Sequence, residues 1–147
     1  MQPFADTFPG RLGQLAQREP DAVALASTGR PPLTRARLAE LVASTAGALN
    51  RAGAGRGDCV AIVMPHGAEL ATACLAVSSC AAAAPLNPEY REAEFAFQFE
   101  SLKPRLVLLA AGHGAAVRAL AQARGIPVVD VVPVDGAKSL RSLPADL

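Results

Sequence analysis

Short apolar runs alternate along the chain with longer segments in which apolar residues recur at helical intervals. The short runs predict strands, which lie at Val23–Ser27, Cys59–Met64, Ala82–Leu86, Leu106–Ala110 and Val128–Val132. Several of these runs are apolar at consecutive positions, which is typical of strands that are covered on both faces. The pattern therefore predicts an α/β fold class: a three-layer, mostly parallel, doubly wound sheet with helices on both faces.

The longer segments predict helices, which lie at about Pro9–Arg18, Arg35–Ala52, Gly67–Ser79, Arg91–Leu102 and Gly114–Arg124. Thr34 is suited to cap the start of the second helix, and Gly53 is suited to follow its end. Gly125, with Pro127 shortly after it, is a strong stop signal for the last helix.

The regular pattern ends near Val132. Residues 1–132 are therefore predicted to form one α/β unit, which the family resemblance described below implies to be an N-terminal subdomain. Residues 133–147 are rich in Asp, Gly, Lys, Ser and Pro and have no periodicity, which predicts a linker or tail. A chain of 147 residues with 51% hydrophobic residues can bury a core without disulfides or a structural metal.

Charge is nearly balanced, with 14 Lys and Arg against 13 Asp and Glu, so the net charge is +1. This balance provides no electrostatic footprint for nucleic acid or an anionic membrane. The longest uncharged run, Leu70–Asn87, is just short of a bilayer span and consists mostly of small residues. We interpret it as a buried helix followed by a buried strand, and we expect neither a nucleic-acid partner nor a membrane span.

The cysteines Cys59, Cys74 and Cys80 form no CxxC pair, and with only two histidines elsewhere in the chain they make no recognisable zinc cluster. We therefore expect free thiols and no metal site. An odd number of cysteines, together with an N-terminus that lacks a secretory pattern, predicts a reducing compartment and a cytoplasmic location.

Glycines 53, 55 and 57 suggest a phosphate-binding loop, but they follow a helix and lead into a strand. Phosphate-binding loops have the opposite order, strand to helix, so we interpret this cluster as a helix stop and a turn. The GxxxxGK pattern of a Walker loop is absent from the sequence.

Candidate ligand contacts lie in the loops that follow strands, because ligands of open parallel sheets gather beyond the carboxyl ends of the strands. These loops are 65–67, 87–91 and 112–114. His66 is either a ligand contact or general base, or a helix-entry histidine with a local hydrogen bond; the second reading is favoured. His113 is typical of a surface loop. Asp130 is expected to face water at a strand end, in preference to being a buried carboxylate with a partner.

Four strings occur in an order that resembles a known family: REPDAVAL at 18–25, LTRARLAELV at 33–42, AGAGRGDCVAIVMPHGAEL at 52–70 and AAAAPLNPEYREAEF at 81–95. Together they resemble the N-terminal part of an acyl-CoA synthetase of the adenylate-forming (AMP-binding) superfamily. Arg37 departs from the family, which often has Glu there, and this removes the capping box with Thr34. His66 stands where the family frequently has Asn.

The resemblance implies an ATP-dependent acid–CoA ligase, which forms an acyl adenylate and then a thioester. It implies ATP, Mg²⁺ and CoA for the full-length parent, and none of them in this chain. The family's phosphate loop, nucleotide motifs and adenylation lysine lie downstream of the matched region. We therefore expect this chain to be inactive alone, to hold no catalytic residue, and to have the remainder of the ligase as its partner. Self-association is a second expectation, since a part of a larger protein leaves an apolar face.

The resemblance also implies a set of cofactor-binding residues, because the loop after the family's Asn-Pro pair can lie close to the CoA nucleotide. Arg91 is the basic residue there, whereas Glu89 would repel a phosphate. Arg91 is either a contact to a CoA phosphate or a solvated arginine at the start of a helix, and the second reading is favoured. Asn87 and His66 complete the predicted set. Two alternatives remain: a stand-alone α/β binding or regulatory module with a ligand near His66, Asn87 and His113, and the start of a peptide-synthetase adenylation domain.

Overall fold

The computed structural model describes residues 7–132. Its helices are α1 (Phe8–Arg18), α2 (Arg35–Arg51), α3 (Ala68–Ser78), α4 (Glu92–Leu102) and α5 (Ala115–Ala123). Its strands are β1 (Val23–Leu25), β2 (Leu33–Thr34), β3 (Cys59–Val63), β4 (Ala82–Leu86), β5 (Leu106–Ala110) and β6 (Val128–Val131). The predicted tail, residues 133–147, lies outside the described residues.

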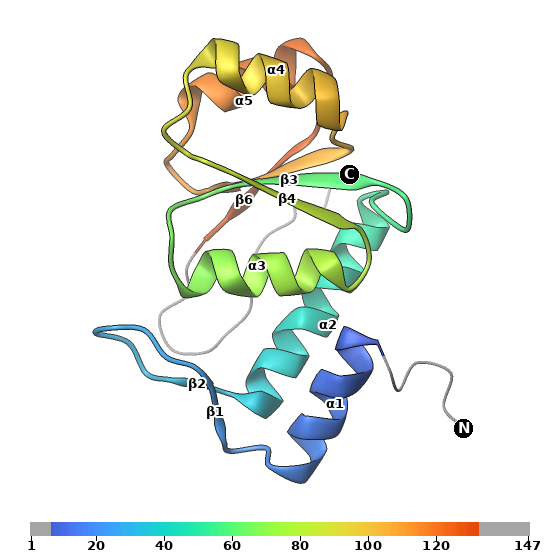
Figure 1. Cartoon of the computed structure of the whole chain (residues 1–147), viewed down its shortest axis with the longest axis vertical. Coiled ribbons are helices and arrows are strands. Elements are labelled where there is room, and N and C mark those ends of the chain that lie inside the picture. Colours follow the sequence, from blue (N-terminus) through green and yellow to red (C-terminus); the bar gives the residue numbers. More distant parts are fainter. Residues whose placement is uncertain (1–6, 133–147) are drawn as a thin grey trace.

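A parallel sheet with the strand order β4-β3-β5-β6 forms the centre of the structure. Helices α2 and α3 cover one face, and α4 and α5 cover the other (Figure 1). In β3, Ile62 packs toward α3 while its neighbour Val63 packs toward α4 and α5. The predicted three-layer, doubly wound fold class is confirmed.

The strand order changes direction beside β3. From β3 the chain passes through α3 to β4 on one side, and then returns through α4 to β5 on the other side of β3. The loops after β3 and β5 therefore diverge toward opposite faces of the sheet. This kind of switch point opens a crevice at the carboxyl ends of the strands, where ligands of open α/β sheets bind.

The prediction that Val23–Ser27 joins the parallel sheet is wrong. β1 pairs antiparallel with β2 in a separate two-stranded sheet. The side chain of Val23 is exposed, so this run is not covered on both faces. This hairpin, α1 and α2 form an N-terminal layer around Leu12, Leu38 and Val42, next to α3 (Figure 1).

The predicted helix ends are confirmed. Thr34 Oγ1 accepts a hydrogen bond from the Arg37 backbone N–H at 3.3 Å. Gly53 and Gly125 have φ of 84° and 65°, the left-handed conformation that glycine adopts easily after a helix. The glycine cluster is also a turn, in which Asp58 Oδ2 accepts from the Gly55 N–H at 2.9 Å.

β4 and β6 are the edges of the parallel sheet among the described strands. Pro85 lies within β4, opposite Ile62 of β3. A proline has no N–H for the ladder, so it is tolerated in a strand that has a partner on one side only. In residues 7–132, none of the helices has the length and apolar character that crossing a bilayer requires.

Candidate functional site

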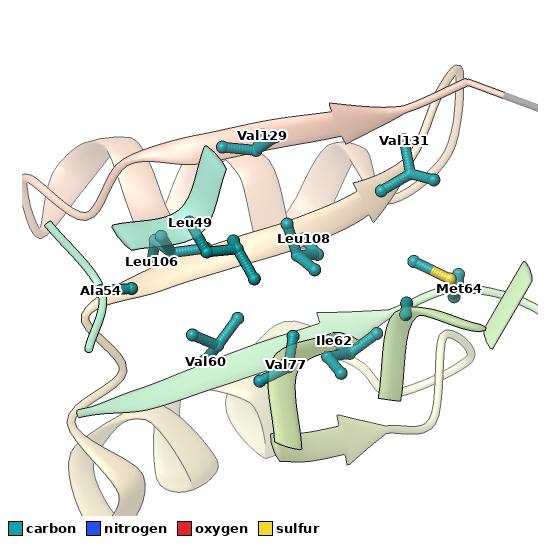
Figure 2. Packing of buried hydrophobic residues seen from close by; sticks show 11 residues of the cluster. Leu49, Ala54, Val60, Ile62, Met64, Val77, Leu106, Leu108, Val129 and Val131 are labelled. Carbon is teal, nitrogen blue, oxygen red and sulfur yellow. The ribbon is translucent and has the colours of Figure 1, made fainter. Parts of the chain in front are cut away.

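A pocket of about 180 Å³ lies at the switch point, beyond the carboxyl ends of β3, β5 and β6. It is lined by Arg30, Met64, Pro65, His66, Glu69, Ala110, Ala111, His113 and Val131. Met64 follows β3 and Val131 ends β6, and both belong to the apolar cluster between the sheet, α2 and α3 (Figure 2). The pocket therefore has an apolar floor that continues into the core.

Two histidines reach this pocket from different loops. His66 precedes α3, and His113 lies in the loop between β5 and α5. Because β3 and β5 are neighbours in the sheet, residues 47 positions apart line the same space. The sequence alternative of a binding module with a ligand near His66, Asn87 and His113 therefore has its two histidines at one pocket, whereas Asn87 lies outside the lining.

The position of His113 is fixed by its own loop. Its Nδ1 lies 3.1 Å from the carbonyl oxygen of Ala111, and glycines flank it on both sides with φ of 77° and 72°. A carbonyl oxygen only accepts hydrogen bonds, so Nδ1 must carry the hydrogen. In the neutral ring, Nε2 is then an acceptor.

Arg30 and Glu69 contribute an ion pair to the pocket lining. Arg30 lies in the turn between β1 and β2, and Glu69 lies in the first turn of α3. The pair ties the hairpin to the start of α3 across 39 residues of sequence. Neither residue was predicted as a site residue, because no sequence pattern indicates that this turn returns to the sheet.

The predicted residues Asn87 and Arg91 do not line this pocket. Asn87 forms a local turn, in which its Oδ1 accepts from the Glu89 N–H at 3.0 Å. Arg91 is the exposed N-cap residue of α4, and its own backbone N–H donates to Glu94 Oε2 at 2.8 Å. The loop that follows β4 therefore forms a second group of polar side chains, separate from the histidine pocket.

Asp130 agrees in part with each of the two alternatives that the sequence leaves open, a water-facing residue at a strand end and a buried carboxylate with a partner. Its side chain is partly exposed, and it forms an ion pair with Arg118 of α5. It lies within β6 and not beyond its end.

The three cysteines are free, as predicted. Burial raises the pKa of the Cys59, Cys74 and Cys80 thiols, which disfavours the reactive thiolate. In the described part of the chain, His, Cys, Asp and Glu side chains form no group of three that could hold a metal ion.

Comparison with known proteins identifies relatives that are much longer than this chain. It is 34% identical over 138 residues to an oxalate–CoA ligase of Arabidopsis thaliana, which covers 92% of this chain and 27% of that protein. It is also 34% identical over 112 residues to the phenyloxazoline synthase MbtB of Mycolicibacterium paratuberculosis, covering 76% of this chain and 10% of that protein. The chain thus spans about a quarter of the length of the first relative.

The fold is shared with the O-succinylbenzoate coenzyme A synthetase of Bacillus subtilis, solved in complex with AMP. The TM-score is 0.68 at 24% identity, over 81% of this chain and 30% of that one. The family described as AMP-binding enzyme matches residues 12–146, which is most of the chain. With this match and the fold in agreement, the chain belongs to the AMP-binding enzyme family, the adenylate-forming superfamily that the sequence strings resemble.

Proposed function

We propose that the chain is the N-terminal portion of an ATP-dependent acid–CoA ligase. The observation that carries the proposal is its 34% identity to an oxalate–CoA ligase across 92% of its length. In such a reaction, a carboxylate oxygen attacks the α-phosphorus of ATP, pyrophosphate leaves, and an acyl adenylate forms. The thiol of CoA, losing its proton, then attacks the acyl carbon and displaces AMP.

In this proposal the chain supplies a scaffold and ligand contacts, not the reacting groups. The attack on phosphorus requires an amide-rich loop and positioned cations, and in this proposal another part of the ligase supplies them. Among the described residues, His, Cys, Asp and Glu side chains form no group of three that could hold a metal ion, and we assign no Mg²⁺-dependent step to this chain. We therefore expect the isolated chain to release no pyrophosphate from ATP.

The loop after β4 supports a role for Arg91 toward a CoA phosphate. Its side chain is exposed at the start of α4, and a guanidinium can donate two parallel hydrogen bonds to a phosphate. Asn87 fixes the turn that leads to it. His66, at the neighbouring strand end, is the third residue of this proposed CoA-facing set.

A chimera tests the proposed function directly. Residues 1–147 would replace the matching segment of the Arabidopsis oxalate–CoA ligase, and pyrophosphate release and thioester formation would be measured with oxalate, ATP and CoA. We expect activity from the chimera and none from the isolated chain or from the ligase lacking the segment. Pyrophosphate release by the isolated chain would refute the scaffold role.

The same chimera tests the CoA contact. Arg91→Ala should raise the KM for CoA several-fold and leave pyrophosphate release in the first half-reaction unchanged, since a phosphate contact acts only on the second substrate. Arg56→Ala, which removes a cation before β3, at the opposite end of the sheet, is the matched control. A KM for CoA that Arg91→Ala leaves unaltered would remove Arg91 from the proposal.

A second candidate is the start of a peptide-synthetase adenylation domain, which the similarity to the phenyloxazoline synthase MbtB supports. In that case the acyl group would pass to a carrier-bound thiol in place of CoA. Thioester formation in the chimera would then fail with free CoA, although pyrophosphate release would persist.

A further inference from the structure

The histidine pocket at the switch point shares His66 with the proposed CoA-facing set, but it is otherwise distinct from it, because Asn87 and Arg91 lie outside its lining. Its polar side chains come from the β1–β2 turn, the start of α3 and the loops after β3 and β5. We propose that this pocket binds a compact oxyanion, a sulfate- or phosphate-like group or a carboxylate, through His113 and His66, with an affinity that increases as the imidazoles take up protons.

The charges that line the pocket favour an anion. Among the described residues that line it, Glu69 is the one carboxylate, and this group already pairs with Arg30. A guanidinium has five N–H donors, so donation to Glu69 leaves others for a ligand. Within residues 7–132, a cationic ligand would meet Arg30 and find no carboxylate in the lining that lacks a partner.

The hydrogen bond of His113 determines the direction of the pH dependence. Because Nδ1 donates to the Ala111 carbonyl, the neutral ring presents a lone pair at Nε2, which repels an anion. Protonation converts Nε2 into a charged donor, and charge-assisted hydrogen bonds are the stronger kind. Among the described residues, the other ionisable side chains of the lining are His66, Arg30 and Glu69, and β6 contributes only Val131.

The volume of the pocket limits the size of the ligand, and its apolar floor favours a ligand with an apolar part. At about 180 Å³ it is smaller than the roughly 300 Å³ at which pockets for drug-sized ligands begin. Met64, Ala110 and Val131 line it with apolar atoms, which suits an anion that carries a small apolar body. This inference concerns the chain on its own and does not depend on ligase activity.

The test uses the 147-residue chain with sodium sulfate and sodium benzoate as probes, at constant ionic strength. Both probes keep their charge between about pH 6 and about pH 8, so any change in affinity belongs to the protein. Histidine ring C–H resonances report occupancy in NMR titrations. Sulfate tests a tetrahedral oxyanion and benzoate a planar one with an apolar body.

We expect at least one probe to shift both histidine resonances saturably and to bind about tenfold more tightly at the lower pH. His113→Gln, which keeps a polar side chain but cannot be charged, should abolish this pH dependence, and His66→Gln should reduce it. Arg56→Gln, an equal loss of positive charge outside the pocket, should behave as the unchanged chain. No saturable shift in the tens of millimolar, equal affinity at both pH values, or an unaltered His113→Gln titration would overturn the proposal.

Discussion

Gly112 and Gly114 flank His113 and share the same backbone conformation, but their surroundings differ. Both have positive φ, 77° and 72°. A Cβ at Gly112 would meet nothing within 4 Å, whereas a Cβ at Gly114 would lie 2.7 Å from Leu109 Cδ2 and 2.8 Å from Val117 Cγ1. Only glycine at position 114 allows α5 to begin this close to β5.

Alanine substitutions at these two positions distinguish the energetic cost of backbone strain from the cost of overpacking. We expect Gly112→Ala to lower the free energy of unfolding by about 1 kcal/mol, the cost of left-handed backbone. Gly114→Ala should cost about 2 to 4 kcal/mol, because overpacking adds to that strain. Urea unfolding of both variants measures the difference. Equal losses would show that the contacts with Leu109 and Val117 relax at no cost.

At the residue scale, the sequence predicts which residues follow the strands and suggests a ligand near His66, Asn87 and His113, but the pocket brings together only the two histidines of that group. His66 and His113 are both recognisable as residues of loops that follow strands. Their shared pocket depends on β3 and β5 being neighbours, which the order of runs along the chain does not specify. The Arg30–Glu69 pair depends on the path of the β1–β2 turn, and no local signal encodes that path.

Helix α2 carries an unusual hydroxyl among its buried residues. Thr45 is 8% exposed, and its Oγ1 has no hydrogen-bond partner within the described structure. Thr72 in α3 is equally buried, but its Oγ1 donates to the Ala68 carbonyl oxygen at 2.8 Å. A buried polar group without a partner loses its hydration and gains nothing in return.

Thr45→Val should therefore stabilise the protein by about 1 kcal/mol, since the methyl group replaces a hydroxyl that lacks a partner. Thr72→Val is the matched control and should be neutral or destabilising by up to about 1 kcal/mol, because it removes a hydrogen bond. Thermal and urea unfolding of the two variants show whether each substitution raises or lowers the free energy of unfolding. If Thr45→Val is the less stable of the two, then Thr45 has a partner that the structure does not show.

At the element scale, the prediction succeeds where the apolar pattern is long and fails where it is short. Helix α2 has a readable cap at its start and a glycine stop at its end, and α5 has a glycine stop at its end. β1 has three residues and β2 only two, too few for alternation to distinguish a hairpin from a buried strand. The sequence therefore predicts that Leu33 and Thr34 lead into a helix, but it does not predict that they pair with β1.

At the scale of the molecule, apolar side chains remain exposed on opposite sides of the sheet. Figure 1 shows α1 and β1 on one side of the sheet and α4 on the other. Phe8 and Leu15 belong to α1, Val23 to β1 and Phe97 to α4, and all four side chains are exposed, Phe97 to 66% and Val23 to 58%. Each of them could bury apolar area against another molecule.

Self-association of the isolated chain is the expected consequence. Sedimentation equilibrium over a range of concentrations should show an average mass that rises with concentration. Phe97→Ser should reduce this rise, whereas Thr72→Ser, a change at a buried position, should not. A constant monomer mass at the highest concentration would contradict the expectation.

Pro85 gives the sheet a protection that the rest of its edge lacks. An edge strand offers its free backbone groups to any other extended chain, and this is how ordered aggregates begin to grow. At Pro85 that row of donors is interrupted in the middle of β4. A folding intermediate that exposes β4 therefore presents other extended chains with one backbone donor fewer than a strand without proline would.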